Sequence, residues 1–250
     1  MATVNYYAGT SGLVLPVPNK SYYPAAFKDK SRLCYYASLF NSIEVNSSFY
    51  KIPQEKTVTK WTKEVPDDFR FTFKLWRGIT HEKGLDFNPA DITRFMEAIN
   101  AAGTHKGCLL VQFPPSAKAN LMPRLAQLTG LIQNADPDSS WKIAIEFRHS
   151  SWYADRLLHF AETNNLSIVL QDIPASATPL DYATDDTVYL RFHGPGGKYR
   201  GSYPDDVLAE YGTYIREWQE EGKTVYAYFN NTMGDAIKNL ATLSMFVQQA

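Results

Sequence analysis

Eight short apolar runs, separated by longer stretches with helix signals, are the feature that most constrains the fold of this chain. The runs are rich in Val, Ile, Phe and Tyr, the residues that strands prefer. Strands that alternate with helices form parallel sheets covered by helices. The expected strands are residues 5–8, 42–45, 69–75, 107–113, 142–147, 167–171, 187–192 and 224–229.

Helix start and stop signals lie between these runs. Asn88 is a candidate cap, Pro89 suits the first helical position, and Gly103 is typical of a helix end. Ser151 is a candidate cap in the same way. The expected helices are residues 31–39, 54–64, 89–103, 121–133, 152–164, a long helix from Pro204 to Gly222, and residues 235–246. Residues 174–186 are expected to form a loop or a short turn.

A single (β/α)8 TIM-like barrel over residues 1–250 is the fold that this pattern favours. The chain has 250 residues, which is near the usual size of such a barrel. Apolar residues make up 44%, enough for a sizeable core. A doubly wound open sheet is the alternative. We find no repeat, linker or low-complexity tract, and we place no domain boundary.

The charge and the cysteines exclude some classes of protein. The net charge of −1 gives no global basic field, so nucleic acid is a possible partner but not a favoured one. Cys34 and Cys108 lie in apolar runs without metal-ligand spacing, so we expect two buried free thiols. Neither a signal peptide nor an apolar run of about 18 residues is recognisable, so we expect no membrane span and a cytoplasmic location.

Polar side chains gather where the strands end. In the fifth strand Ile145 and Phe147 share one face, while Glu146 and Arg148 share the other. In six strands one face is apolar and the opposite face becomes polar or charged as the strand ends. The apolar face therefore belongs against the helices, and the other face lines a barrel lumen. Such groups must pair, bind a ligand or face water, since burial without a partner costs several kcal/mol. The residues selected by this parity are Glu44, Asn46, Lys74, Gln112, Glu146, Arg148, Arg191, His193, Tyr228 and Asn230.

Residues in the loops that follow the strands add to this candidate site. Enzymes of this fold build their active sites at the carboxyl ends of the strands. A glycine-rich loop follows the seventh strand; it offers backbone amides to an anion, and it is also typical of a plain flexible loop. The loop residues added to the site are His81, Trp152, Asp172, Lys198, Arg200 and Asn231. We interpret His105 and His159 as structural.

The motifs at these strand ends resemble those of a known family. They are Gly9-Thr-Ser-Gly, Tyr22-Tyr-Pro, Phe40-Asn-Ser-Ile-Glu-Val-Asn-Ser-Ser-Phe-Tyr, Phe71-Thr-Phe-Lys, Ile79-Thr-His, Glu146-Phe-Arg-His-Ser-Ser-Trp, Gln171-Asp, Leu190-Arg-Phe-His-Gly and Tyr228-Phe-Asn-Asn. Their order is similar to that of the YecE-like proteins, catalogued as domain of unknown function 72. The resemblance covers nearly the whole chain and implies a barrel, without an assigned reaction. One departure is Leu13-Val-Leu-Pro, where the family usually has an aromatic residue and a tryptophan-containing loop.

An enzyme acting on a small anionic substrate is the first functional hypothesis. Lys74, Arg148 and Arg191, with His81, would hold a phosphate, sulfate or carboxylate. Acid–base chemistry of the hydrolase or isomerase type needs no organic cofactor, and we expect none. The candidate proton-transfer residues are Glu44, Glu146, Asp172 and His193. Arg148 and Arg191 are the expected main anchors; alternatively, nearby carboxylates occupy both of them.

Two other classes of function remain open. Glu146, Asp172 and His193 have the side chains of a divalent-metal site, as in a metal-dependent nuclease or sugar isomerase. Two interleaved arginines would repel the cation, so we expect no tightly bound zinc or iron. A non-catalytic nucleic-acid or metabolite binder is the third class, since aromatic residues near the strand ends can stack on bases. Those aromatic residues are Phe49, Tyr50, Trp76, Trp152 and Tyr199. The sequence does not indicate the oligomeric state.

Overall fold

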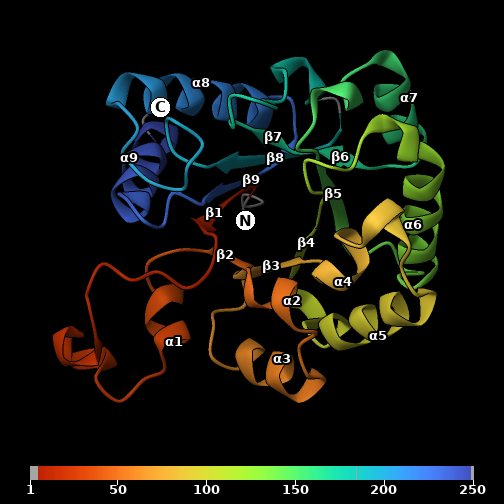
Figure 1. Cartoon of the computed structure of the whole chain (residues 1–250). Coiled ribbons are helices and arrows are strands. Elements are labelled where there is room, and N and C mark those ends of the chain that lie inside the picture. Colours follow the sequence, from red (N-terminus) through yellow and green to blue (C-terminus); the bar gives the residue numbers. More distant parts are fainter. Residues whose placement is uncertain (1–4, 184, 249–250) are drawn as a thin grey trace.

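The fold is a mixed α/β arrangement of parallel strands, with helices outside them. The structure is a computed structural model that describes residues 5–183 and 185–248. In Figure 1 the strands surround the middle of the molecule and the larger helices lie around them. The strands are β1 Tyr6–Thr10, β2 Ser42–Val45, β3 Arg70–Lys74, β4 Lys106–Gln112, β5 Lys142–Glu146, β6 Ser167–Ile168, β7 Leu170–Gln171, β8 Thr187–Phe192 and β9 Thr224–Phe229.

The helices connect the strands along the chain. The α-helices are α1 Arg32–Ala37, α2 Ser47–Tyr50, α3 Glu55–Thr62, α4 Arg77–Thr80, α5 Pro89–Asn100, α6 Met122–Asn134, α7 Asp155–Thr163, α8 Asp205–Glu220 and α9 Ala236–Gln248. The 3-10 helices are η1 Lys20–Tyr22, η2 Ala25–Phe27, η3 Lys83–Leu85, η4 Gly103–His105, η5 Ala119–Leu121, η6 Ser150–Trp152 and η7 Leu180–Tyr182. No helix in the described ranges has the length and apolar character needed to cross a membrane.

The strands form two parallel sheets rather than one clear eight-stranded sheet. One has the order β1-β9-β8-β7 and the other β2-β3-β4-β5-β6. The expected strand at 167–171 is divided: β6 pairs with β5, β7 pairs with β8, and Val169 between them donates its amide to Ile145 O at 2.9 Å. At the other junction, Ser11 and Glu44 form a single parallel bridge.

Side chains replace the backbone ladder between β1 and β2. Asn41 accepts from Ala8 N at 2.9 Å and donates to Tyr6 O at 2.8 Å. The hydroxyl of Tyr36 accepts from Thr10 N at 2.7 Å and donates to the carbonyl of Ser42 at 3.1 Å. These side chains satisfy backbone groups that strand pairing would otherwise use. This is the physical reason why the two sheets meet there through one bridge.

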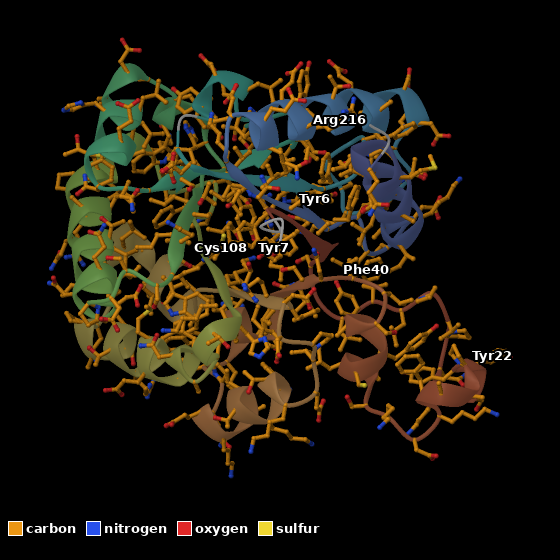
Figure 2. The ribbon with its side chains drawn as sticks, turned by 180° about the vertical axis from the view of Figure 1, so that it is seen from behind. Tyr6, Tyr7, Tyr22, Phe40, Cys108 and Arg216 are labelled. Atoms are coloured by element: carbon orange, nitrogen blue, oxygen red, sulfur yellow. The ribbon has the colours of Figure 1, made fainter. Side chains whose placement is uncertain are left out.

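The alternating strand faces separate two sets of buried side chains, as the sequence predicts. The outward faces join the main core with the helices, and the inward faces form a smaller cluster. The inward cluster is Tyr7, Cys108, Leu110, Ala144, Val169, Tyr189, Tyr226 and Tyr228. Figure 2 shows Tyr7 and Cys108 in the middle of the molecule, and Tyr22 far from them. Cys108 is buried as expected, but Cys34 is only half-buried, because α1 lies at the edge of the fold.

The predicted helix boundaries are mostly close, with one wrong cap. Asn88 caps α5, accepting from Ala90 N at 3.1 Å, and Pro89 is its first residue. Ser151 does not cap a helix: it lies in η6, its hydroxyl accepts from Ala119 N, and α7 begins at Asp155. The short helices α2 and α4 lie inside segments for which we predicted no helix.

Candidate functional site

Arg191, whose side chain is fully buried, lies at the centre of a group of charged and polar residues. Its Nε and Nη2 donate to the two carboxylate oxygens of Glu44 at 2.8 and 2.6 Å. Its Nη1 donates to Glu146 at 2.6 Å and approaches His193 Nε2 at 3.1 Å. Glu146 also pairs with Arg148 Nε. We call Glu44, Glu146, Arg148, Arg191 and His193 the ion cluster.

The two carboxylates of the ion cluster are held in their charged form. Burial alone would raise the pKa of Glu44, but the guanidinium of Arg191 and the hydroxyl of Ser11 hold it below its usual value. Burial likewise opposes ionisation of Glu146, while Arg148 and Arg191 lower its pKa strongly. Both therefore carry a negative charge at neutral pH and act as partners of the arginines.

Asp172 and Tyr203 position His193. Asp172 Oδ1 accepts from the backbone amide of His193 at 2.8 Å and lies 3.1 Å from its Nδ1. Tyr203 donates to the other oxygen of Asp172. Burial and the two arginines of the ion cluster lower the pKa of His193, despite Asp172. This favours a neutral imidazole with its proton on Nδ1, so Nε2 accepts from Arg148 and Arg191.

A cleft of about 610 Å³ opens over the ion cluster. Its lining combines cations, amides and apolar side chains, and we call it the cationic cleft. The lining residues are Asn46, Phe49, Tyr50, Lys74, Arg77, His81, Gln112, Pro114, Pro115, Arg148, Tyr199, Asn230, Thr232 and Met233. Lys74 and Gln112 end strands, and Asn46 and Asn230 directly follow strands. The carboxyl ends of parallel strands thus supply the floor of the cleft.

The described lining of the cationic cleft contains no carboxylate. It contains Lys74, Arg77 and Arg148 instead, together with His81. Burial, then the charges of Lys74, Arg77 and Arg148, lowers the pKa of His81 to about 4, so this imidazole is neutral at pH 7. Among these cations only Arg148 has an acidic partner in the described structure, and that partner, Glu146, lies beneath the cleft.

Phe49 brings several of these groups together. The Nζ of Lys74 lies 4.0 Å from the centre of the Phe49 ring, and the guanidinium carbon of Arg77 lies 6.0 Å from it. His81 contacts the same ring edge-on, with 4.9 Å between the ring centres. The short helix α2 carries Phe49, and α4 carries Arg77. Ser48 on α2 donates to the carbonyl of Lys74 at 2.7 Å, which fixes α2 against the end of β3.

Two polar atoms in the cleft have no protein partner in the described ranges. The side-chain oxygen of Asn46 is buried and accepts no hydrogen bond. Lys74 is only 8% exposed, and its ammonium makes neither an ion pair nor a hydrogen bond with a described residue. A buried polar atom without a partner is costly, so the Asn46 oxygen is suited to a ligand or to water, and Lys74, whose ammonium has no described acceptor, lines the same cleft.

The expected convergence of the strand-end residues is confirmed. Arg191 bonds to Glu44 and Glu146 across the sheets. The other strand-end residues of the predicted set join the ion cluster or line the cationic cleft, with the exception of Tyr228. The predicted residues that line the cleft are Asn46, Lys74, His81, Gln112, Arg148 and Asn230.

Arg191 does not reach the cleft, contrary to its expected role as a main anchor. Its side chain is fully buried, and its nitrogens are directed at Glu44, Glu146, His193 and, at 3.5 Å, Ser11. The alternative stated above, in which carboxylates occupy the arginine, therefore holds for Arg191. Arg148 differs, because it contacts Glu146 and also faces the cleft.

Other predicted site residues lie outside the cleft lining. Trp152 is buried in the core, where it stacks on Phe147 with ring centres 4.2 Å apart. Tyr228 lies deeper than the cleft, and its hydroxyl bonds to Ser42 and Thr72 at 2.6 and 2.7 Å. Asn231 donates to Gly201 O and to Asn239, and Lys198 and Arg200 are exposed outside the lining.

Arg77 is the cleft cation that the sequence analysis missed, and Pro114, Pro115, Thr232 and Met233 were missed with it. Arg77 follows β3 by three residues, close to the predicted site residues Lys74 and His81. A systematic inclusion of every charged residue within a few positions of a strand end would have found it.

The donor geometry does not fit the metal-dependent alternative. His193 Nε2 accepts from two guanidinium groups, which occupy the position a cation would need. Its Nδ1 faces Asp172. Within residues 5–183 and 185–248, no group of three or more His, Cys, Asp and Glu side chains is placed to hold a metal ion.

Comparison with known proteins supports the resemblance seen in the motifs. The YunF protein of Bacillus subtilis is 27% identical over 257 residues, covering 88% of this chain and 87% of its own. The YecE protein of Escherichia coli K12 is 26% identical over 119 residues, covering 48% of this chain and 42% of its own. Both carry the designation UPF0759.

Solved structures extend the similarity to the fold. A DUF72 family protein from Enterococcus faecalis V583 superposes with a TM-score of 0.81 at 25% identity, covering 98% of this chain and 96% of the other. A DUF72 family protein from Thermotoga maritima MSB8 has a TM-score of 0.79 at 23% identity, with coverages of 98% and 99%. The model of the family described as "Protein of unknown function DUF72" matches residues 7–250, so this chain belongs to the DUF72 family.

Proposed function

We propose that this protein is an enzyme that acts on a small anionic substrate in the cationic cleft. The substrate carries a phosphate, sulfate or carboxylate group. We further propose that the two sheets act as one (β/α)8 barrel, with the cleft as its mouth. Two connections between the sheets support this view. One is the Ser11–Glu44 bridge, and the other is the continuous segment through Val169, which joins β6 of one sheet to β7 of the other.

The observation that carries the proposal is the charge of the lining, which holds two guanidinium groups and the amino group of Lys74 but no carboxylate in the described residues. Positive charges brought together in a partly enclosed space repel one another, and an anion relieves that repulsion. The pKa of Lys74 reflects this environment, since burial and then Arg191 lower it to about 8, against the opposing effect of Glu44 and Glu146.

Arg77 and Arg148 are the proposed anchors. Arg77 is exposed and has no acidic partner in the described structure, and Arg148 faces the cleft with a guanidinium that Glu146 holds in place. A planar guanidinium binds two oxygens of one anion at once. Gln112 and Asn230 line the same space and can bond the uncharged part of the substrate.

The proposed proton-transfer groups are those that face the cleft. Glu44 and Glu146 are fully buried beneath it and paired with arginines, so they act as positioning residues. His193 and Asp172 also lie outside the lining, where they are bonded to each other. His81 and Lys74 remain as groups that can exchange protons with a bound molecule. Acid–base chemistry without an organic cofactor is the proposed reaction type.

Titration of the protein with inorganic phosphate, sulfate and small carboxylates tests the binding step. We expect saturable binding by calorimetry and a rise in melting temperature. Arg77→Met removes an anchor without stranding an acidic partner, so it weakens binding while the protein stays folded. Arg94→Met is the matched control, because Arg94 pairs with Asp91 on α5 outside the cleft.

Two outcomes would contradict the proposal. One is an unaltered protein that binds none of these anions. The other is an equal loss of binding in both variants.

Turnover is then sought by following a panel of phosphate esters, sulfate esters and hydroxy acids by NMR. Consumption of one of them that Arg77→Met reduces and Arg94→Met leaves intact supports an enzyme.

A binder of nucleotides or single-stranded nucleic acid is the second candidate. Tyr50 and Met233, both 63% exposed, and Tyr199, 38% exposed, all line the cleft and offer surfaces on which bases can stack. Binding of an oligonucleotide that weakens steeply with added salt, without turnover of any small anion, would favour this candidate.

A further inference from the structure

The buried lysine in the cationic cleft has the surroundings of a covalent catalyst. Lys74 ends β3, is 8% exposed and lines the cleft, yet its ammonium has no acceptor among the described residues. An ordinary structural lysine in such a place is paired with a carboxylate. The carboxylates whose charges act on Lys74, Glu44 and Glu146, are already bonded to Arg191, with Arg148 on Glu146 as well.

We propose that Lys74 forms an imine with the carbonyl group of an anionic aldehyde or ketone bound in the cationic cleft. This inference rests on the proposed function and names the substrate class. Arg77 and Arg148 hold the anionic group, and the amine of Lys74 meets the carbonyl carbon.

Imine formation from the amine of Lys74 and a carbonyl group is a balanced reaction. The neutral amine adds to the carbonyl carbon, and a proton passes from nitrogen to oxygen to give a carbinolamine. The C–O bond then breaks, the oxygen leaves as water after taking up another proton, and a positively charged iminium remains. From the ammonium form, the sum is one ammonium and one carbonyl giving one iminium and one water, without oxidation or net proton change.

The surroundings of Lys74 favour each part of this sequence. A pKa of about 8, lowered by burial and Arg191 from 10.5, leaves about one amine in ten neutral at pH 7. The Phe49 ring, 4.0 Å from Nζ, stabilises the positive iminium as it does the ammonium. His81 contacts the same ring and is a neutral imidazole at pH 7, so it can carry the proton between nitrogen and oxygen.

A trapping experiment tests whether Lys74 forms an imine with anionic carbonyl compounds and not with a neutral one. The full chain is incubated at pH 7 with pyruvate, with glycolaldehyde phosphate or with acetone, and sodium cyanoborohydride then reduces any imine to a stable amine. Intact mass and peptide mapping locate the adduct. We expect one adduct per chain, at Lys74, with one or both of the anionic compounds and none with acetone. The two anionic arms separate a carboxylate-bearing from a phosphate-bearing substrate.

We expect imine formation to favour Lys74 strongly over exposed lysines. The neutral fraction of Lys74 exceeds that of an ordinary exposed lysine by on the order of a hundredfold at pH 7, since each pKa unit is a factor of ten. Lys74→Met abolishes the adduct, and the matched variant Lys198→Met, which removes an exposed lysine outside the lining, leaves it unchanged. Peptide mapping of the unaltered chain decides the question if Lys74→Met does not fold.

The outcomes also separate this inference from the proposed function. Phosphate binding without an adduct at Lys74 overturns the imine and leaves anion binding intact. Adducts spread evenly over exposed lysines, or an equal yield with acetone, likewise overturn it. An adduct at Lys74 with pyruvate that inorganic phosphate suppresses, and that Arg77→Met reduces, supports both.

Discussion

Replacing Arg191 by methionine tests whether this residue is a structural partner rather than a ligand anchor. Methionine keeps much of the volume but removes the charge that compensates Glu44 and Glu146. Glu146 keeps Arg148, whereas the partners left to Glu44 among the described residues are the hydroxyl groups of Ser11 and Tyr189, which donate at 2.5 and 2.7 Å. One buried carboxylate is therefore left without a cation, which costs about 3–5 kcal/mol.

The assay is urea unfolding at pH 7, followed by tryptophan fluorescence. A loss of about 3–5 kcal/mol is expected for Arg191→Met. The control Arg94→Met removes a surface pair whose arginine side chain is 61% exposed, and it loses no more than about 1 kcal/mol. Adding Glu44→Gln to Arg191→Met removes the stranded charge and restores part of the loss.

A small effect would refute the reasoning. If Arg191→Met costs less than about 1 kcal/mol, the ion cluster does not hold the strand ends together in the way its geometry implies. If Glu44→Gln deepens the loss instead of relieving it, the cost does not come from an unpaired carboxylate.

Three further predictions concern stability. The folded-state pKa values of Glu44 and Glu146 lie below their unfolded values. The stability that these residues contribute is therefore complete above pH about 4.3 and falls as the pH drops through the folded values. Urea midpoints that rise on acidification would contradict this. Trp152→Ala costs about 3–5 kcal/mol in unfolding experiments yet leaves phosphate binding in the cleft unchanged, since this ring is core. Gly9→Ala yields little folded protein on expression, because its Cβ would lie 2.0 Å from the carbonyl oxygen of Ser42, where the β1 and β2 backbones approach; a normal melting temperature would refute this.

Much of the fold can be predicted from local patterns in the sequence. Strands β2, β8 and β9 have the bounds that the apolar runs predict. Side-chain alternation along a strand is fixed by backbone geometry, so the inward and outward faces could be assigned without knowing the neighbours. The short helices α2 and α4 escaped prediction because single helical turns have too few residues to show a period.

The sequence also determined which residues meet. Glu146, Arg148, Arg191 and His193 lie within two residues of a strand end, and parallel strands bring those ends to one edge whatever the loops do. The sequence alone thus indicated that polar and basic side chains gather at one edge, with Lys74 among them, although it missed Arg77.

Only the tertiary structure decided how the members divide their roles. Arg148 and Arg191 have the same parity and similar positions at their strand ends, yet Arg191 pairs with a glutamate 147 residues away and is buried, while Arg148 faces the cleft. Tyr228 is held in the interior by a bond to Ser42, 186 residues away, and Trp152 by a bond to the carbonyl of Ala117, 35 residues away. Local sequence fixes the direction of a side chain, but the cost of burying its charge or hydroxyl depends on partners that only the folded chain brings near.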